Sequence, residues 1–221
     1  MDRAMNPAPG TRVPSGLNSR HTYQAAAATF ADLAARVSAT QLAGPGLGDW
    51  SVRELLGHIV SSGLSPVSPY DGQQPDLAAP SAYFAVLNAA SLEEIQSVNA
   101  LTTQNARKIG LELGEDPGPV VSRRVETAMS ALKNVDDEDL VATPVGSMRL
   151  RDWLPTRTLE LVVHSSDIAV ATGLEVDFPA DALSESAALV ARGAAVIGAG
   201  LPVLQALTGR DPLPAGFSMV L

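Results

Sequence analysis

The chain contains no cysteine. This absence excludes a disulfide framework, a zinc site built from cysteine and a protein thiol that acts as a nucleophile. If the protein performs thiol chemistry, the thiol has to come from another molecule. With 221 residues, the chain is still long enough for one sizeable domain that buries a core without covalent links.

Aromatic side chains are scarce as well. They make up only 4% of the residues, whereas apolar residues as a class reach 46%. Alanine is abundant, so small side chains must fill much of the interior, and this suits closely packed helices better than a β-sandwich. We therefore expect an all-α protein.

Positive charge is in the minority, with 15 Lys and Arg residues against 24 Asp and Glu residues and a formal net charge of -9. A surface of this sign does not gather phosphates, so we expect no nucleic-acid partner. The longest apolar run, GAAVIGAGLPVL at 193–204, is shorter than the ~20 residues that span a bilayer. Residues 1–20 lack the apolar core of a signal peptide and predict a flexible lead. These features predict a cytoplasmic protein without a membrane partner.

Apolar residues at helical spacing predict helices along most of the chain. The second of these has the clearest start, because Ser51 and Glu54 form a capping box. The glycines at 44–48 lack a preceding strand and G-x-G-x-x-G spacing, so they predict a turn and not a nucleotide site. The segment DLVATPVGSMRL fits either a short hairpin or a loop. The predicted helices cover 21–41, a segment starting at 51, 81–113 with a break near Ser91, 117–135, 150–172 and 180–207.

The segment TLELVVHSSDIA at 158–169 puts charged residues on the face that a helix would turn toward the core. With about 100° between successive residues, Arg157, His164 and Asp167 fall within roughly 60° of Glu160 and form one stripe. Ionised groups placed inward are costly unless they are paired, hydrogen-bonded or bound to a metal. Two interpretations are open: an ion-pair network or wet groove, and a metal site. Apolar side chains border the stripe on both sides: Leu161, Val163, Ile168 and Val170.

A metal site would need a third ligand, because Glu-x-x-x-His supplies only two. The chain has three histidines, so the search is short. We expect His21 to be exposed beside the lead. His58 lies one turn after Glu54, and a lone helical histidine is more often hydrogen-bonded or partly exposed than a ligand. Facing helices that project ligands inward are nevertheless the usual way to build a metal site, and His58 would complete a two-His, one-Glu set.

Two segments resemble a known family. DWSVRELLGHI at 49–59 is similar to the W-[S/T]-x-x-[E/D]-L-x-x-H signature of the DinB-like superfamily, in the actinobacterial branch named after mycothiol-dependent maleylpyruvate isomerase. TRTLELVVHSSDIAVATG at 156–173 resembles the second signature of that branch, in which Glu and His complete the site and an Asp follows. LTGRDPLPAGFS at 207–218 resembles the end of its short members. The similarity covers nearly the whole chain from about His21 onward.

This resemblance implies a DinB-like four-helix bundle over 21–175, preceded by the lead at 1–20. An additional C-terminal helix and a short extended tail, at 176–221, would pack on the bundle. The family binds a divalent metal, commonly zinc, and the matching ligands here are His58, Glu160 and His164. Asp167 and Arg157 would lie beside them and orient His164 and Glu160.

The family also implies an activity. In the named isomerases, mycothiol supplies a thiol that adds to the double bond of maleylpyruvate, permits rotation and leaves. Those enzymes carry a separate C-terminal domain, whereas about 48 residues follow Gly173. We therefore expect a metal-dependent thiol (mycothiol) S-transferase or isomerase-like enzyme that acts on a small electrophilic molecule. The alternatives are a non-catalytic metal-binding bundle with a structural or sensing role, and a metal-dependent hydrolase.

Two smaller questions are left open by the residues. Pairing into a homodimer is one. The other is the motif at 208–210, where Arg210 either follows a plain helix C-cap, which we favour, or reaches an anionic ligand.

Overall fold

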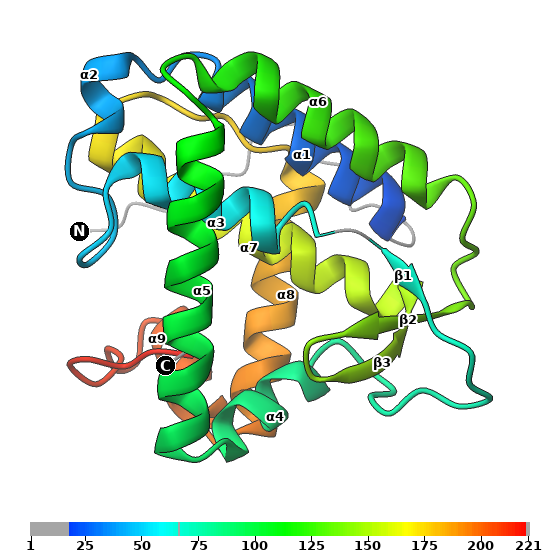
Figure 1. Ribbon diagram of the computed structural model, residues 1–221. Coiled ribbons are helices and arrows are strands. Elements are labelled where there is room, and N and C mark those ends of the chain that lie inside the picture. The colour runs from blue at the N-terminus through cyan, green and yellow to red at the C-terminus, as the bar shows by residue number, and fades with distance from the viewer. Residues whose placement is uncertain (1–17, 66, 220–221) are drawn as a thin grey trace, which may run out of the picture.

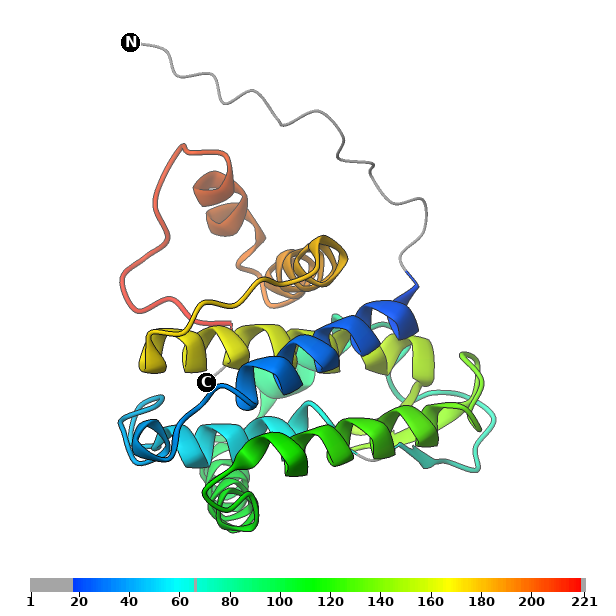
Figure 2. The same cartoon turned by 90° about the horizontal axis from the view of Figure 1, so that it is seen from above.

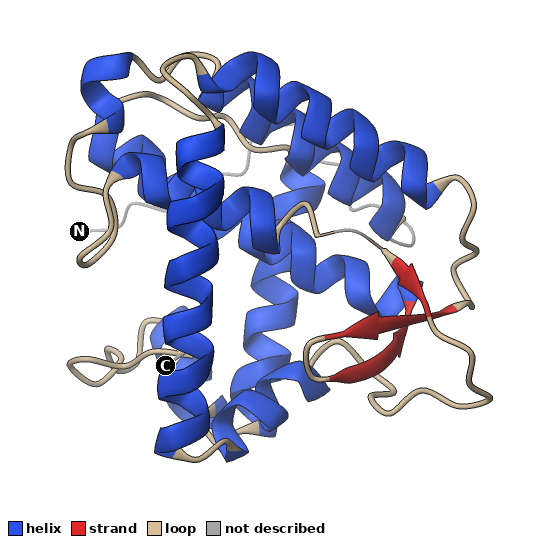
Figure 3. Ribbon diagram, viewed as in Figure 1, coloured by secondary structure: helices blue, strands red, loops and turns tan. Residues whose placement is uncertain are grey.

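The computed structural model describes residues 18–65 and 67–219, and over them the chain is mostly helical, as predicted (Figures 1 and 3). Most of the predicted lead, residues 1–17, lies outside the described residues. A small three-stranded sheet accompanies the helices. In chain order the elements are α1 (Ser19–Ala34), α2 (Ala39–Leu42), α3 (Val52–Ser62), β1 (Ser68–Pro69), α4 (Ala82–Ala89), α5 (Leu92–Glu112), α6 (Pro117–Leu132), β2 (Leu140–Thr143), β3 (Gly146–Arg149), α7 (Leu150–Thr172), α8 (Ala180–Val196) and α9 (Gly200–Leu207).

Local capping explains where several helices begin. The predicted capping box of α3 is present, with the Ser51 and Glu54 side chains each bonded to the other residue's backbone N–H. The predicted break near Ser91 is confirmed, because Ser91 forms a second capping box with Glu94 at the start of α5. A third box, at Ser38, starts the short α2. The predicted helix 21–41 is therefore two helices, α1 and α2.

The C-terminal prediction also needs a correction. Residues 180–207 form two helices, α8 and α9, and not one. Gly198 lies between them with φ of +83°, a conformation that does not continue a right-handed helix and that glycine adopts without strain. α9 packs on α8 and has no buried residue.

The segment 139–150 forms the hairpin, which settles one alternative. β2 and β3 pair antiparallel, and β1 joins the other edge of β2. Gly146 follows the tight turn with φ of +122°. Val141 and Met148 face each other across the pair, and both are buried. β2 and β3 both pack against α7.

α7 is the central helix. It contacts α1, α3 and α8, and the views in Figures 1 and 2 show α8 on one side of it and α3 on the other. α1 also packs against α6. Fully buried apolar side chains from α1, α3 and α7 form the core between these helices: Phe30, Leu33, Leu55, Leu56, Ile59, Leu154 and Leu161.

α5 crosses α3 at very short range (Figures 1 and 2). A Cβ atom on Gly57 would lie 2.2 Å from the carbonyl oxygen of Ala106, and one on Gly110 would lie 2.8 Å from the carbonyl oxygen of Arg53. Two glycines, one on each helix, thus allow the backbones to touch. Because α3 carries His58, this crossing fixes one side of the candidate site.

No helix in the described part of the chain combines the length and the apolar character needed to cross a membrane.

Candidate metal centre

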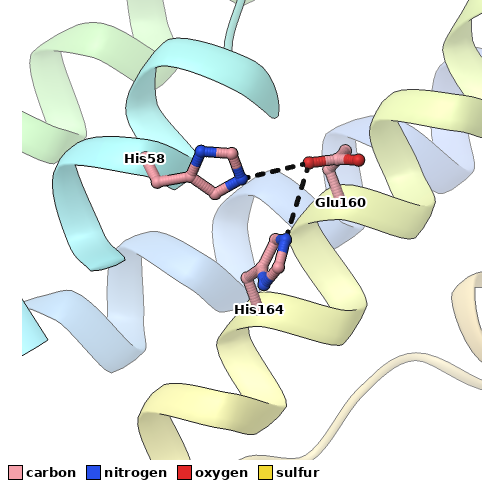
Figure 4. Close-up of side chains that lie close together, drawn as sticks. All are labelled: His58, Glu160 and His164. Carbon is pink, nitrogen blue, oxygen red and sulfur yellow. Dashed lines mark ion pairs between the residues drawn. The ribbon is translucent and has the colours of Figure 1, made fainter. Parts of the chain in front are cut away.

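His58 from α3 meets Glu160 and His164 from α7 (Figure 4). Glu160 Oε2 lies 3.5 Å from His58 Nε2 and 3.7 Å from His164 Nε2. The three ligand atoms all lie within 4.8 Å of one another, so the group could hold a metal ion. The structure therefore brings together three residues that the sequence singled out, although 102 positions separate His58 from Glu160 (160 minus 58).

The helices position these side chains through their buried faces. Glu160 and His164 are one turn apart on α7 and project from the same side. Leu161 and Ile168, which are fully buried next to that stripe, set the rotation of α7. On α3, the buried Leu55 and Ile59 do the same for His58. The site thus depends on core packing that is independent of any ion.

Asp167 orients His164. The His164 Nδ1–H donates to Asp167 Oδ2 at 2.9 Å, which places the proton on Nδ1 and leaves the lone pair of Nε2 toward Glu160. A carboxylate on the far nitrogen of a ligating imidazole is the usual arrangement in metal proteins, because it fixes the ring and makes it more basic. The predicted place of Asp167 beside His164 is what the structure has.

His58 is held differently. Its Nδ1 is buried and has no hydrogen-bond partner within the described ranges. The ring lies instead between Trp50, with centroids 4.9 Å apart, and His164, edge-on at 4.8 Å. Trp50 in turn donates its indole N–H to Thr103 on α5 at 3.3 Å. Residue spacing gave no sign of this role for Trp50, although it stands eight residues before His58 in the same motif.

Arg157 lies close to the site, but its hydrogen bonds go to residues other than Glu160. Its Nη1 donates to the carbonyl oxygen of Ser62 at 3.0 Å, and its Nε donates to Thr156 Oγ1 at 3.1 Å. The guanidinium also stacks on Trp153, 3.9 Å from the ring centroid. In the described part of the chain it forms no hydrogen bond to Glu160. Arg157 thus acts on Glu160 through its charge and ties α7 to the end of α3.

Glu160 stays ionised. Burial would raise the pKa of this carboxyl, but the hydrogen bond to His58 and the positive charge of Arg157 outweigh burial and lower the pKa to about 2. At neutral pH the site therefore presents a carboxylate oxygen. Two imidazole nitrogens and one carboxylate oxygen are a donor set that suits zinc and other divalent transition metals.

Between His164 and Glu160 the geometry suits a cation better than a direct hydrogen bond, whereas His58 forms a hydrogen bond with Glu160. His164 uses its Nδ1 proton on Asp167, so its Nε2 faces Glu160 Oε2 as one acceptor facing another. A cation between them satisfies both lone pairs, whereas an ion pair would require a second proton on the His164 ring. The side chains of His58, His164 and Glu160 are 11%, 19% and 22% exposed, so the group is shielded but reachable from solvent.

The remaining candidate residues lie elsewhere. His21 is exposed at the start of α1, as expected, and is outside the group. Arg210 is also exposed; its Nη1 donates to the Thr208 carbonyl oxygen, and Gly209 has φ of +68°. These features match the C-cap interpretation of the motif.

Comparison of the chain with protein-family models, with curated proteins and with solved structures finds no match. The resemblance to the DinB-like superfamily thus remains a prediction carried by the residues at 49–59 and 156–173.

Proposed function

We propose that the chain is a DinB-like enzyme that binds a divalent metal, with zinc preferred, and uses it to transfer a thiol to a small electrophilic molecule or to rearrange that molecule. Mycothiol is the proposed thiol cosubstrate. The observation that carries the proposal is the convergence of His58, Glu160 and His164 from two helices. α1, α3, α6 and α7 are the helices that we assign to the bundle.

Three protein ligands favour catalysis over a purely structural ion. Structural zinc sites usually close with four protein ligands, whereas catalytic sites keep a position for substrate. In the described residues, the group of candidate ligands has three members. A divalent ion bound there supplies a strong local charge that lowers the pKa of a thiol or water and polarises a substrate oxygen.

The chain's own residues have separate tasks in this proposal. Glu160 contributes the negative charge, and Asp167 holds the His164 ring in place. Trp50 covers one face of His58 and excludes water from that side. Since the chain has no cysteine, the thiol has to be a separate molecule, and this favours a thiol cosubstrate over a protein nucleophile.

The first experiment tests the metal. Purified protein is analysed for bound ions and titrated with zinc after chelation, alongside His58→Ala and His164→Ala. His21→Ala is the matched control, because that histidine is exposed and outside the group. We expect about one ion per wild-type chain, loss of the ion in both site variants and no change in the control. Equal zinc binding by all four proteins would overturn the proposed site.

The second experiment tests the reaction. Metal-loaded protein is incubated with mycothiol and a panel of electrophiles, and thiol adducts and isomers are followed by mass spectrometry and chromatography. Products that depend on both thiol and His164 support the transferase or isomerase. Hydrolysis without thiol would instead indicate the hydrolase. If metal binds and supports folding but no product forms, the structural or sensing alternative holds, since the ion would then only link α3 to α7.

A further inference from the structure

A pocket lies on the side of α7 that packs against α8. It has a volume of about 400 Å³ and is lined by α7, α8, Ser19 of α1 and the segment before α4. α8 packs against both α4 and α7 there (Figure 1). None of the three candidate metal ligands lines it. A volume of this size suits a small organic ligand.

The pocket contains a buried acid that is only half satisfied. Glu185 is 6% exposed, and its Oε1 accepts a hydrogen bond from the Ser19 hydroxyl at 2.7 Å. Its Oε2 is buried and has no hydrogen-bond partner within 18–65 and 67–219. Thr158 lies beside the carboxyl, but its hydroxyl donates to the carbonyl oxygen of Leu154. A buried carboxyl oxygen without a donor is costly, so this position favours a ligand that supplies one.

A second acid lines the same pocket. The side chain of Asp152, in the first turn of α7, is half-buried and forms neither an ion pair nor a hydrogen bond with any described residue. Burial raises the pKa of Asp152 against the opposing charges of Arg151 and Arg149, and burial likewise raises the pKa of Glu185. Burial thus removes part of the solvation of both carboxyl groups.

The rest of the lining distinguishes between kinds of ligand. Pro80, Pro155 and Leu189 supply apolar walls. Arg192 lines the pocket from α8, is exposed and forms no ion pair with any described residue. Arg151, the other arginine, is already paired with Glu138. The lining thus combines a buried and a half-buried acid, apolar side chains, and an exposed arginine that forms no ion pair with any described residue.

We propose that this pocket binds a small aliphatic molecule with an ammonium group at one end and a carboxylate at the other. Asp152 and Glu185 accept hydrogen bonds from the ammonium, the apolar walls contact the carbon chain, and Arg192 pairs with the carboxylate. A metal ion suits the pocket less well, since an arginine would lie close to the cation and only two acids are present. This site does not depend on the proposed metal chemistry.

The test uses 4-aminobutyrate and two analogues that each lack one charge, butylamine and butyrate. Binding is measured by calorimetry and by NMR chemical shifts on the full chain. The variants are Glu185→Gln, Asp152→Asn and Arg192→Gln. Arg123→Gln is the matched control, because Arg123 is exposed, outside the pocket and without an ion pair among the described residues.

We expect wild type to bind 4-aminobutyrate more tightly than either analogue. Glu185→Gln and Asp152→Asn should each weaken both amines about tenfold. Arg192→Gln should weaken 4-aminobutyrate to the level of butylamine and leave butylamine unchanged, which a folding defect would not do. Arg123→Gln should bind like wild type. The proposal is overturned if no amine binds, if butyrate binds as well as 4-aminobutyrate, or if Glu185→Gln and Arg192→Gln leave every affinity unchanged.

Discussion

The hydrogen bond between His164 and Asp167 gives a graded prediction for metal affinity. Asp167→Asn keeps an oxygen that accepts the Nδ1–H but removes its charge. Asp167→Ala removes the acceptor altogether. Loss of such a carboxylate usually costs 10- to 100-fold in affinity, at about 1.4 kcal/mol per tenfold step. The bond is short, at 2.9 Å, but the Asp167 side chain is 30% exposed, so water can replace part of it.

We therefore expect a loss of about tenfold in zinc affinity for Asp167→Asn and a larger loss, up to about 100-fold, for Asp167→Ala. Affinity is measured by competition with a zinc-binding dye on chelator-treated protein. Asp32→Asn, at an exposed position on α1, removes the same charge away from the site. The reasoning fails if Asp167→Ala binds zinc like wild type, or if Asp32→Asn weakens binding as much as Asp167→Asn.

Three further predictions concern stability. Burial raises the pKa of Glu185 in the folded protein, so the folded state favours the protonated side chain. The contribution of Glu185 to the free energy of unfolding is therefore full below the ordinary Glu pKa of about 4.3 and is lost as pH rises through the folded pKa. Glu185→Gln should therefore melt higher than wild type at neutral pH, and the two melting curves should converge in acid. Gly57→Ala should destabilise the protein by about 3 kcal/mol in urea unfolding, since its Cβ would meet the Ala106 carbonyl oxygen; a change near zero would contradict the close crossing. Chelation should lower the melting temperature of metal-loaded protein. The free energy of unfolding should fall by about 2.7 kcal/mol where the free ion had exceeded its Kd 100-fold, and His58→Ala should not respond to the chelator.

The sequence was most informative where local interactions decide the structure. The predicted capping box at Ser51 marks the start of α3, and the break predicted near Ser91 coincides with a second capping box at the start of α5. The spacing of Glu160 and His164 put two candidate ligands on one face of α7, because residues four apart lie on the same side of a helix. The break at Gly198 was missed because the apolar pattern continues on both sides of it.

Contacts between distant segments could not be read in this way. Residue spacing alone left His58 as one candidate among alternatives, since its distance from Glu160 depends on how α3 packs on α7, and only the resemblance to the DinB-like family paired it with Glu160 and His164. Periodicity gave no sign that Arg157 would bind the end of α3. The burial of Glu185 likewise depends on Ser19, which lies 166 positions earlier. Such features follow from tertiary packing, which residue spacing does not encode.

Two of the three candidate ligands lie on α7 and the third lies on α3, and this arrangement has a consequence for selectivity among divalent ions. The helical pitch sets the separation of Glu160 and His164, so the size of ion that fits is governed by how far α3 stands from α7 at His58. The distance between the two helices depends on residues outside the candidate ligand group. At Gly63, which follows α3, an added Cβ would lie 3.0 Å from Leu161 Cδ2 on α7, so a larger residue there would push the helices apart. Exchanging one small residue along this seam would retune the preference among divalent ions while every donor atom stays the same.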